Sequence, residues 1–228
     1  MKIAVILSGS GVYDGAEIHE SVFTLLALAE RGAEYQVFAP NKNQYHVINH
    51  LTGEEMPETR NILVESARIA RGNAKDLKEY KASDFNGLVI PGGFGAAKNL
   101  NQWAFKGADG EIDADVKRAV VETVQAGKPI AALCMGPTVI AKALEGTPHH
   151  AELTVGTTEE KSPYEIGGIS AGIEQTGAKP VMKTIREVHV DSALKIVTAP
   201  CYMMEGTISD VKKNIDQAVQ KLMTLAMA

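Results

Sequence analysis

The chain has 228 residues, of which 45% are hydrophobic and only 5% aromatic, and its formal net charge is −5. The modest acidity and the lack of a clustered Lys/Arg face exclude a nucleic-acid partner, and no apolar run approaches the ~18 residues that a membrane span needs. Two cysteines in a chain of this length do not make a disulfide framework, and so few cysteines fit a protein of a reducing compartment. With no signal peptide or basic presequence, the sequence predicts a soluble, cytoplasmic protein.

The first elements form a strand, a Gly-rich loop and a helix. Residues 2–7 are an apolar strand, and SGSGVYDGAE leads from it into an amphipathic helix over residues 17–31. The glycines of this loop do not match G-x-G-x-x-G, and the next strand, residues 35–38, ends without an acidic residue for a ribose. A dinucleotide site is therefore not expected.

Three polar residues, Glu17, His19 and Glu20, lie in the first turns of this helix. The helix dipole stabilises carboxylates there, so helix capping is the simplest role for them. Glu17 and Glu20 are three residues apart and can share a face, so either could reach a reactive group held above the same edge of the sheet. His19 points elsewhere and is expected at the surface.

Residues 41–60 have no clear hydrophobic period, which predicts an ordered excursion that lies over the domain. His46 and His50 within it have helical spacing, but no Cys or carboxylate joins them as a third ligand, so no metal site is expected. A helix over residues 59–71 follows and ends at Gly72.

A second Gly-rich loop, Pro91-Gly92-Gly93-Phe94-Gly95, comes directly after a buried strand over residues 86–90. Its simplest interpretation is a tight turn. The functional alternative is an oxyanion hole, because the loop leaves the carboxyl end of a central strand and its backbone N–H groups can approach a ligand closely. A helix over residues 113–125 leads to the next strand.

The sharpest chemical signal is KPIAALCMGPTVIAKAL, residues 128–144. A buried strand over residues 129–133 and a helix over residues 135–144 flank Cys134, which predicts a nucleophile elbow. Free N–H groups and the helix dipole at such a turn favour the thiolate. The alternative is that Cys134 is a small buried hydrophobe. Cys201, with no helix visibly opening on it, is interpreted as a packing residue.

The remaining elements continue the alternation of strands and helices. We expect strands over residues 152–155, 187–190 and 195–198, and helices over residues 166–176 and Ile208–Met227. With no linker and no repeat, the pattern predicts a single α/β domain over residues 1–228, with a doubly wound, mainly parallel sheet.

Three motifs in order, GVYDGAEIHE, PGGFGAAKNL and ALCMGP, resemble the ThiJ/PfpI superfamily of class I glutamine-amidotransferase-like folds. The stretches VILSGSGVYDG, INHLTGEEMPETRNILVESARIARG and VIPGGFGAAKNL resemble its ElbB group, described as glyoxalases or as isoprenoid-biosynthesis proteins with an amidotransferase-like domain. These stretches span most of residues 2–145, and their shared order and spacing make the resemblance specific.

This resemblance implies a three-layer, flavodoxin-like fold that forms a homodimer. It implies that Cys134 is the nucleophile, paired with an acidic residue of the first helix, for which Glu17 is the first choice and Glu20 the second. It further implies that the oxyanion donors are Gly92 and Gly93 of the PGG loop together with the amide of Met135, a residue of the elbow. Family members with glyoxalase activity need no metal and no glutathione.

Two departures from the superfamily affect the predicted function. No H-x-E lies near the C-terminus, and Thr157-Thr158 stand where other members place a histidine, with His189 the only late substitute. A full Cys-His-acid triad and glutamine hydrolysis are therefore not expected. The predicted function is a cofactor-independent glyoxalase that converts a small dicarbonyl, glyoxal or methylglyoxal, to a 2-hydroxy acid through Cys134. The alternatives are a redox-responsive module that uses the same cysteine, and an amidotransferase-like subunit with an incomplete triad.

Overall fold

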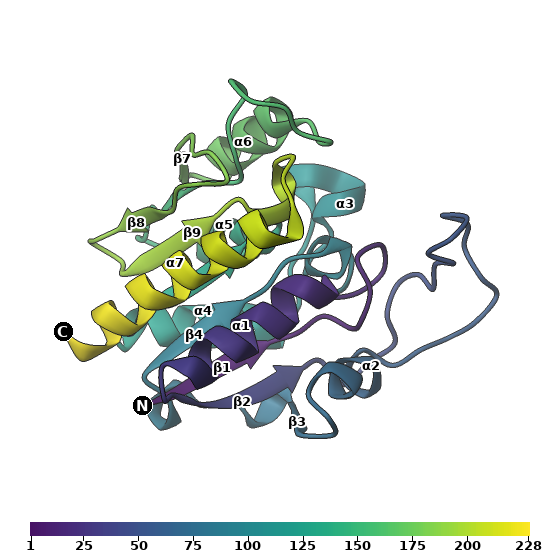
Figure 1. Cartoon of the computed structure of the whole chain (residues 1–228), viewed down its shortest axis with the longest axis horizontal. Helices are drawn as coiled ribbons and strands as arrows, with labels where there is room; N and C mark the ends of the chain where they lie inside the picture. Colours follow the sequence, from purple (N-terminus) through teal and green to yellow (C-terminus); the bar gives the residue numbers. More distant parts are fainter.

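A seven-stranded sheet forms the middle layer of the structure, a computed structural model that describes residues 1–228 (Figure 1). Its strand order is β3-β2-β1-β4-β5-β9-β8, and every neighbouring pair is parallel except β8 and β9. The strands are β1 (Lys2–Ile6), β2 (Glu34–Ala39), β3 (Ala74–Asp76), β4 (Gly87–Ile90), β5 (Ile130–Leu133), β8 (His189–Asp191) and β9 (Ile196–Ala199). This confirms the predicted doubly wound, mainly parallel sheet.

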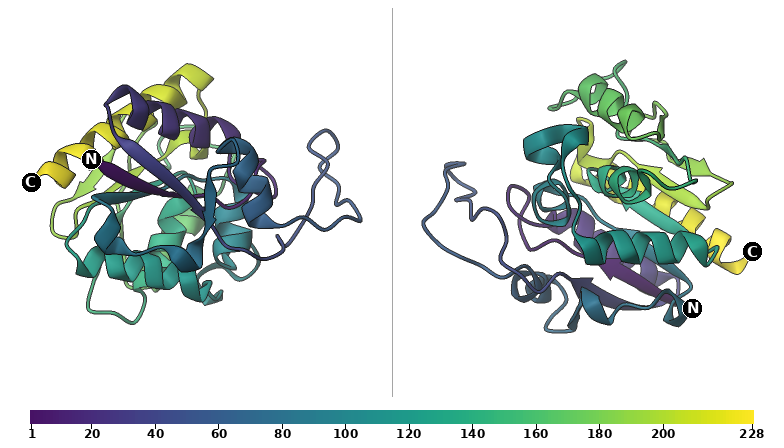
Figure 2. Two further views of the ribbon diagram at one scale, coloured as in Figure 1. Left: turned by 90° about the horizontal axis from the view of Figure 1, so that it is seen from below. Right: turned by 180° about the vertical axis from the view of Figure 1, so that it is seen from behind.

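Helices cover both faces of the sheet. On one face α1 packs against α7, and on the other α4 packs against α5, as the view from below in Figure 2 shows. The helices are α1 (Ile18–Glu30), α2 (Ile62–Ile69), α3 (Trp103–Lys106), α4 (Ala114–Gln125), α5 (Gly136–Leu144), α6 (Ile166–Gln175) and α7 (Ile208–Met227). None of them combines the length and the apolar character that crossing a bilayer requires.

The central strands are buried along their whole length because helices cover both of their faces. All residues of β4, β5 and β9 are buried, which explains why these strands read as continuous apolar runs in the sequence. The short edge strand β3 was not predicted, since its residues are only half-buried or exposed and carry no apolar pattern. The predicted strand over residues 152–155 shortens to β6 (Glu152–Leu153), which pairs with β7 (Lys179–Pro180) in a separate small sheet.

Residues 41–60 form a long excursion without a helix or a strand, as predicted. Its tip does not lie over the domain, however, but projects away from it (Figures 1 and 2). The side chain of Leu51 at the tip is 97% exposed. The tip satisfies backbone groups within itself, because the Gly53 N–H donates to the Asn49 carbonyl oxygen and the Met56 N–H to the Val47 carbonyl oxygen, each at 2.7 Å, so it does not need the domain as a partner.

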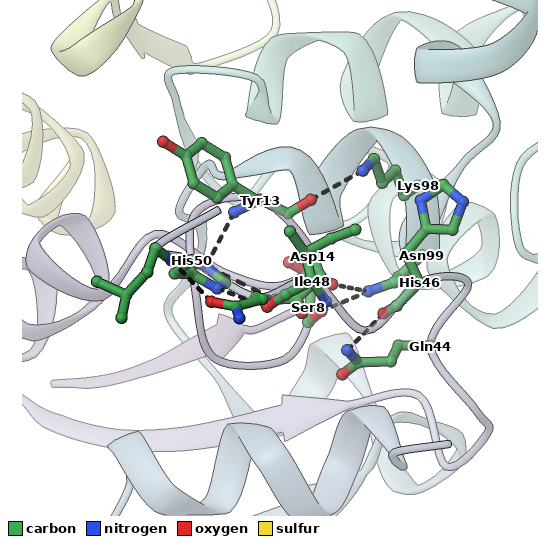
Figure 3. Close-up of polar contacts among 11 residues, drawn as sticks. Ser8, Tyr13, Asp14, Gln44, His46, Ile48, His50, Lys98 and Asn99 are labelled. Carbon is green, nitrogen blue, oxygen red and sulfur yellow. Dashed lines mark hydrogen bonds and ion pairs between the residues drawn. The ribbon is translucent and has the colours of Figure 1, made fainter. Parts of the chain in front are cut away.

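Buried polar contacts fasten the base of this excursion to the loop after β1 (Figure 3). The Asn99 amide donates to the carbonyl oxygens of Ser8 and Asp14, at 2.8 and 2.9 Å, and its oxygen accepts from the Tyr45 N–H at 2.9 Å. The Asp14 carboxylate accepts from the Ile48 N–H at 2.7 Å. Asn99 is 4% exposed, so its partners have little access to water as a replacement.

Asn99→Ala should therefore lower the free energy of unfolding by about 1–3 kcal/mol, because it leaves buried backbone groups without partners. Urea denaturation measures this change. The control is Asn73→Ala, which removes an exposed asparagine and should cost less than about 0.5 kcal/mol. Equal stability of the two variants would show that Asn99 does not anchor the excursion.

Candidate active site

The candidate site lies where several parallel strands end at the same edge of the sheet. The strands β1, β4, β5 and β9 are neighbours, and the segments that follow them carry the start of α1, the PGG loop, Cys134 and Cys201 respectively. In open α/β sheets, ligands bind in the crevice outside the carboxyl ends of the strands. The motifs that the sequence analysis singled out therefore meet in one place.

Cys134 occupies a strained turn between β5 and α5. Its φ of 54° is in the left-handed region, which is uncommon for a residue with a side chain and typical of a nucleophile elbow. A Cβ at Gly136 would lie 2.6 Å from the Ile90 carbonyl oxygen, so the glycine allows α5 to start against the end of β4. The predicted elbow is confirmed as a fold feature.

Glu20 lies against the Cys134 thiol. Its side chain is completely buried, and it accepts hydrogen bonds from the Gly92 N–H at 2.9 Å and from the Tyr202 N–H at 3.4 Å. Burial raises the pKa of Glu20 to about 8, with repulsion from Glu17 as a second cause. At neutral pH the carboxyl group is therefore mostly protonated, and in its ionised form it accepts a hydrogen bond from the Cys134 thiol.

Burial also raises the pKa of the Cys134 thiol well above its ordinary value, and the negative charge of Glu20 adds to this effect. The Gly93 and Met135 N–H groups face the sulfur and act in the opposite direction. The prediction that the elbow favours the thiolate is therefore wrong for the resting protein. The loss of hydration at a buried sulfur outweighs the helix terminus.

Glu17, the first choice for the partner of Cys134, has another position. It is the N-cap of α1, where its carboxylate accepts from the Glu20 N–H at 2.7 Å. Its other oxygen is 3.9 Å from His19 Nδ1, and burial raises its pKa. Glu17 precedes the helix and folds back over the first turn, whereas Glu20 is one turn further on and points to the sheet edge. The structure thus places Glu20, the second choice, against Cys134, and not Glu17, the first choice.

The three predicted oxyanion donors do not have the same surroundings. The Gly92 N–H is already donated to Glu20, so it is not available to an oxyanion. The Gly93 and Met135 N–H groups point toward the sulfur and remain available to a substrate oxygen bound there. A Cβ at Gly92 would lie 2.3 Å from the Cys134 Cβ, so only glycine allows the PGG loop to approach the elbow this closely.

A cavity of about 260 Å³ opens onto Cys134, and sequence reasoning missed most of its walls. They include Trp103, Tyr164 and Tyr202. Burial raises the pKa of Tyr164 to about 12, and the nearby Cys134 and Glu20 contribute to the shift. Tyr164 comes from a loop with no hydrophobic period, and no local signal in the sequence marks it as part of this site.

Histidines do not complete a triad at Cys134. His19 is half-exposed and its Nδ1 is 2.8 Å from the Tyr202 hydroxyl, on the rim of the site. The late candidate His189 instead contacts Glu152, at 3.1 Å. His46 and His50 do not lie on a helix, and no group of three or more His, Cys, Asp or Glu side chains could hold a metal ion.

Cys201 follows β9 as Cys134 follows β5. It is fully buried, its φ is 48°, and its N–H donates to the Asn214 side chain at 2.9 Å. Only a short turn, Cys201–Met203, begins at this position. Cys201 itself does not line the cavity, although Tyr202 and Met203 of the same turn do. The interpretation of Cys201 as a packing residue is confirmed.

Comparison with known proteins agrees with this geometry. The profile described as "DJ-1/PfpI family" matches residues 2–151, which include the start of α1, the PGG loop and the elbow. The chain belongs to the DJ-1/PfpI family. A human relative, "Glutamine amidotransferase-like class 1 domain-containing protein 3, mitochondrial", is 43% identical over 226 residues, which cover 98% of this chain and 83% of that protein. The rat "ES1 protein homolog, mitochondrial" is 41% identical, with 98% and 84% covered.

Solved structures of the DJ-1/PfpI type have the same fold. The crystal structure of an isoprenoid biosynthesis protein with an amidotransferase-like domain from Ehrlichia chaffeensis has a TM-score of 0.89 at 34% identity, over 99% of both chains. DJ-1beta of Drosophila melanogaster has a TM-score of 0.55 at 19% identity, over 99% of this chain and 95% of that one, which shows the fold alone. The predicted family and the three-layer, flavodoxin-like α/β fold are confirmed.

The raised pKa of Glu20 predicts how stability depends on pH. The unfolded chain loses the Glu20 proton near pH 4.5 and the folded chain near pH 8, so wild type should lose stability as the pH rises through this window. Glu20→Gln cannot ionise, so its melting temperature relative to wild type should increase from about pH 5 to about pH 9. Differential scanning calorimetry measures this difference.

The control for this measurement is Glu30→Gln, an exposed glutamate at the other end of α1. Its melting temperature relative to wild type should change little over the same pH range. If the melting temperature of Glu20→Gln relative to wild type were equally constant over this pH range, the assignment of a buried, neutral Glu20 would be wrong.

Proposed function

We propose that the protein is a cofactor-independent glyoxalase that converts glyoxal or methylglyoxal to a 2-hydroxy acid with Cys134 as the nucleophile. The observation that carries the proposal is a thiol in contact with a carboxyl group whose pKa is about 8, below two backbone N–H groups and open to a cavity. A general base works best when its pKa is near the working pH, because a useful fraction of it is then deprotonated and that form is still basic enough to accept a proton.

The first step is addition of sulfur to the aldehyde carbon. Glu20, in its deprotonated form, accepts the thiol proton while the S–C bond forms, so the high pKa of Cys134 does not prevent the reaction. The carbonyl oxygen becomes an oxyanion that accepts hydrogen bonds from the Gly93 and Met135 N–H groups, and protonation gives a hemithioacetal.

The second step moves a proton between the two substrate carbons. A carboxylate removes the C–H proton of the hemithioacetal and returns it to the neighbouring carbon, which leaves a thioester of the 2-hydroxy acid on Cys134. Glu20 lies beside the sulfur, and Glu17 lies on the cavity wall as the second candidate for this transfer. Water then hydrolyses the thioester, which releases the acid and restores the thiol.

Removal of the thiol tests the nucleophile. Cys134→Ser should abolish conversion of glyoxal and methylglyoxal, measured without glutathione and without added metal as formation of glycolate or lactate. The matched control is Cys201→Ala, which removes the neighbouring buried cysteine that does not line the cavity and should retain activity. Full turnover by Cys134→Ser would refute the mechanism.

The pH dependence tests the base. Because Glu20 must be deprotonated, kcat/KM of wild type should rise with pH and level off above about pH 8. Glu20→Gln should lower kcat/KM by about 10²–10⁴-fold, whereas Glu17→Gln should lower it less if Glu20 carries both proton transfers. A profile that is flat between about pH 6 and 9 would exclude Glu20 as the base.

Neither alternative function has an observation in its favour. A redox-responsive cysteine is typically exposed and acidic, whereas Cys134 is buried and its pKa is raised. An amidotransferase-like subunit would need a general acid for the leaving amine, and no histidine contacts Cys134. Peroxide oxidation of Cys134 without any dicarbonyl consumption would favour the redox-responsive module instead.

The homodimer and the cytoplasmic location stay predictions. Ile18, Val22 and Leu26 are exposed at i, i+4 spacing and give α1 an apolar stripe that a second copy could cover. The human and rat relatives are named as mitochondrial proteins.

A further inference from the structure

The cavity above Cys134 is lined almost entirely by apolar groups. Eleven of its thirteen lining residues are hydrophobic. Phe94 of the PGG loop, Trp103 and Ala104 of α3, and Ile169 of α6 form walls of the cavity. A Cβ at Gly172 would lie 2.9 Å from the Trp103 ring, so the glycine allows α6 to pack directly on this aromatic wall.

Few polar groups belong to the residues that line the cavity. They are the Glu17 carboxyl, the Gly93 and Met135 amides, and the Tyr164 and Tyr202 rings with their hydroxyl groups. No Lys, Arg or His is among the lining residues. An anionic group on a ligand, such as a phosphate or the carboxylate of glutamine, would therefore lose its hydration here without finding a cation.

Glyoxal and methylglyoxal are small for this space. The cavity volume of about 260 Å³ corresponds to the share of roughly nine water molecules in the liquid, whereas methylglyoxal has about five heavy atoms. A bound methylglyoxal would leave the walls formed by Phe94, Trp103 and Ile169 without contacts. Apolar cavities of this kind gain most from a ligand that fills them with apolar surface.

We propose that the substrate is an α-oxoaldehyde with an uncharged, apolar substituent about the size of a phenyl ring on its keto carbon. The aldehyde carbon meets Cys134, and the substituent packs between Phe94, Trp103 and Ile169. The reaction adds water overall, so RC(O)CHO becomes RCH(OH)COOH with no oxidant or reductant. The reaction part rests on the proposed glyoxalase function, whereas the choice of substituent rests on the cavity alone.

Steady-state kinetics with three compounds test the substrate class. Phenylglyoxal should have a kcat/KM at least about tenfold above that of methylglyoxal, and 4-carboxyphenylglyoxal should lose at least about tenfold relative to phenylglyoxal, because its charge enters an apolar wall. Product 2-hydroxy acid is measured for each, with Cys134→Ser as the blank for uncatalysed reaction.

A substitution in the cavity wall separates binding from intrinsic reactivity. Ala104→Leu adds apolar volume at an exposed helical position that lines the cavity. It should lower the ratio of kcat/KM for phenylglyoxal to kcat/KM for methylglyoxal at least about tenfold. The matched control is Ala114→Leu, at an exposed position of α4 outside the cavity, which should change neither value.

Covalent labelling of Cys134 tests the cavity even if no dicarbonyl is turned over. N-phenylchloroacetamide should label Cys134 of wild type at least about tenfold faster than chloroacetamide, by intact-protein mass spectrometry, and Ala104→Leu should abolish this preference. Equal labelling by both reagents overturns the inference. If the protein converts dicarbonyls without preferring phenylglyoxal to methylglyoxal, the inference about the substituent is wrong and the glyoxalase proposal stands. If N-phenylchloroacetamide labels Cys134 faster but no dicarbonyl is converted, the inference about the cavity is supported and the glyoxalase proposal is refuted.

Discussion

The structure depends on one contact, a buried carboxyl group against a buried thiol. Glu20 and Cys134 are far apart in the sequence, and they meet because α1, the PGG loop and the elbow all start at the same edge of the sheet. Gly92 and Gly93 have no side chain because a Cβ at either position would lie within 2.4 Å of an atom of the elbow or of the residues that lead into α1. The Gly-rich loop is therefore a packing requirement of this contact as much as a source of N–H donors.

This contact has an electrostatic consequence for the chemistry. Two acids that are buried next to each other cannot both ionise at low cost, so the resting site holds its protons and the thiol is kept unreactive. In the proposed mechanism Glu20 takes the thiol proton during attack, so the nucleophile is not stored as a thiolate. The proposed mechanism therefore does not require a histidine.

The elements around the contact differ in what they contribute. The sheet and the elbow position the reacting groups, and DJ-1beta shares the fold over 99% of this chain at 19% identity. Most of the cavity lining comes from the segments that follow β1, β4, β5 and β9, and α3 together with the part of the chain that contains β6, α6 and β7 adds Trp103, Ala104, Tyr164 and Ile169. A fold match alone does not specify the ligand, because the side chains that line the site do so.

Local patterns in the sequence determined the fold and the place of the site. Continuous apolar runs indicated the buried strands, and PGGFG and the strand-turn-helix around Cys134 indicated the two loops that face each other. The tertiary structure decided what depends on burial by distant segments: that Glu20 rather than Glu17 meets the sulfur, that the thiol pKa is raised, and that Trp103 and Tyr164 enclose a cavity. Secondary structure follows the residues within a few positions along the chain, whereas desolvation depends on every element that packs around a group, and no local pattern records it.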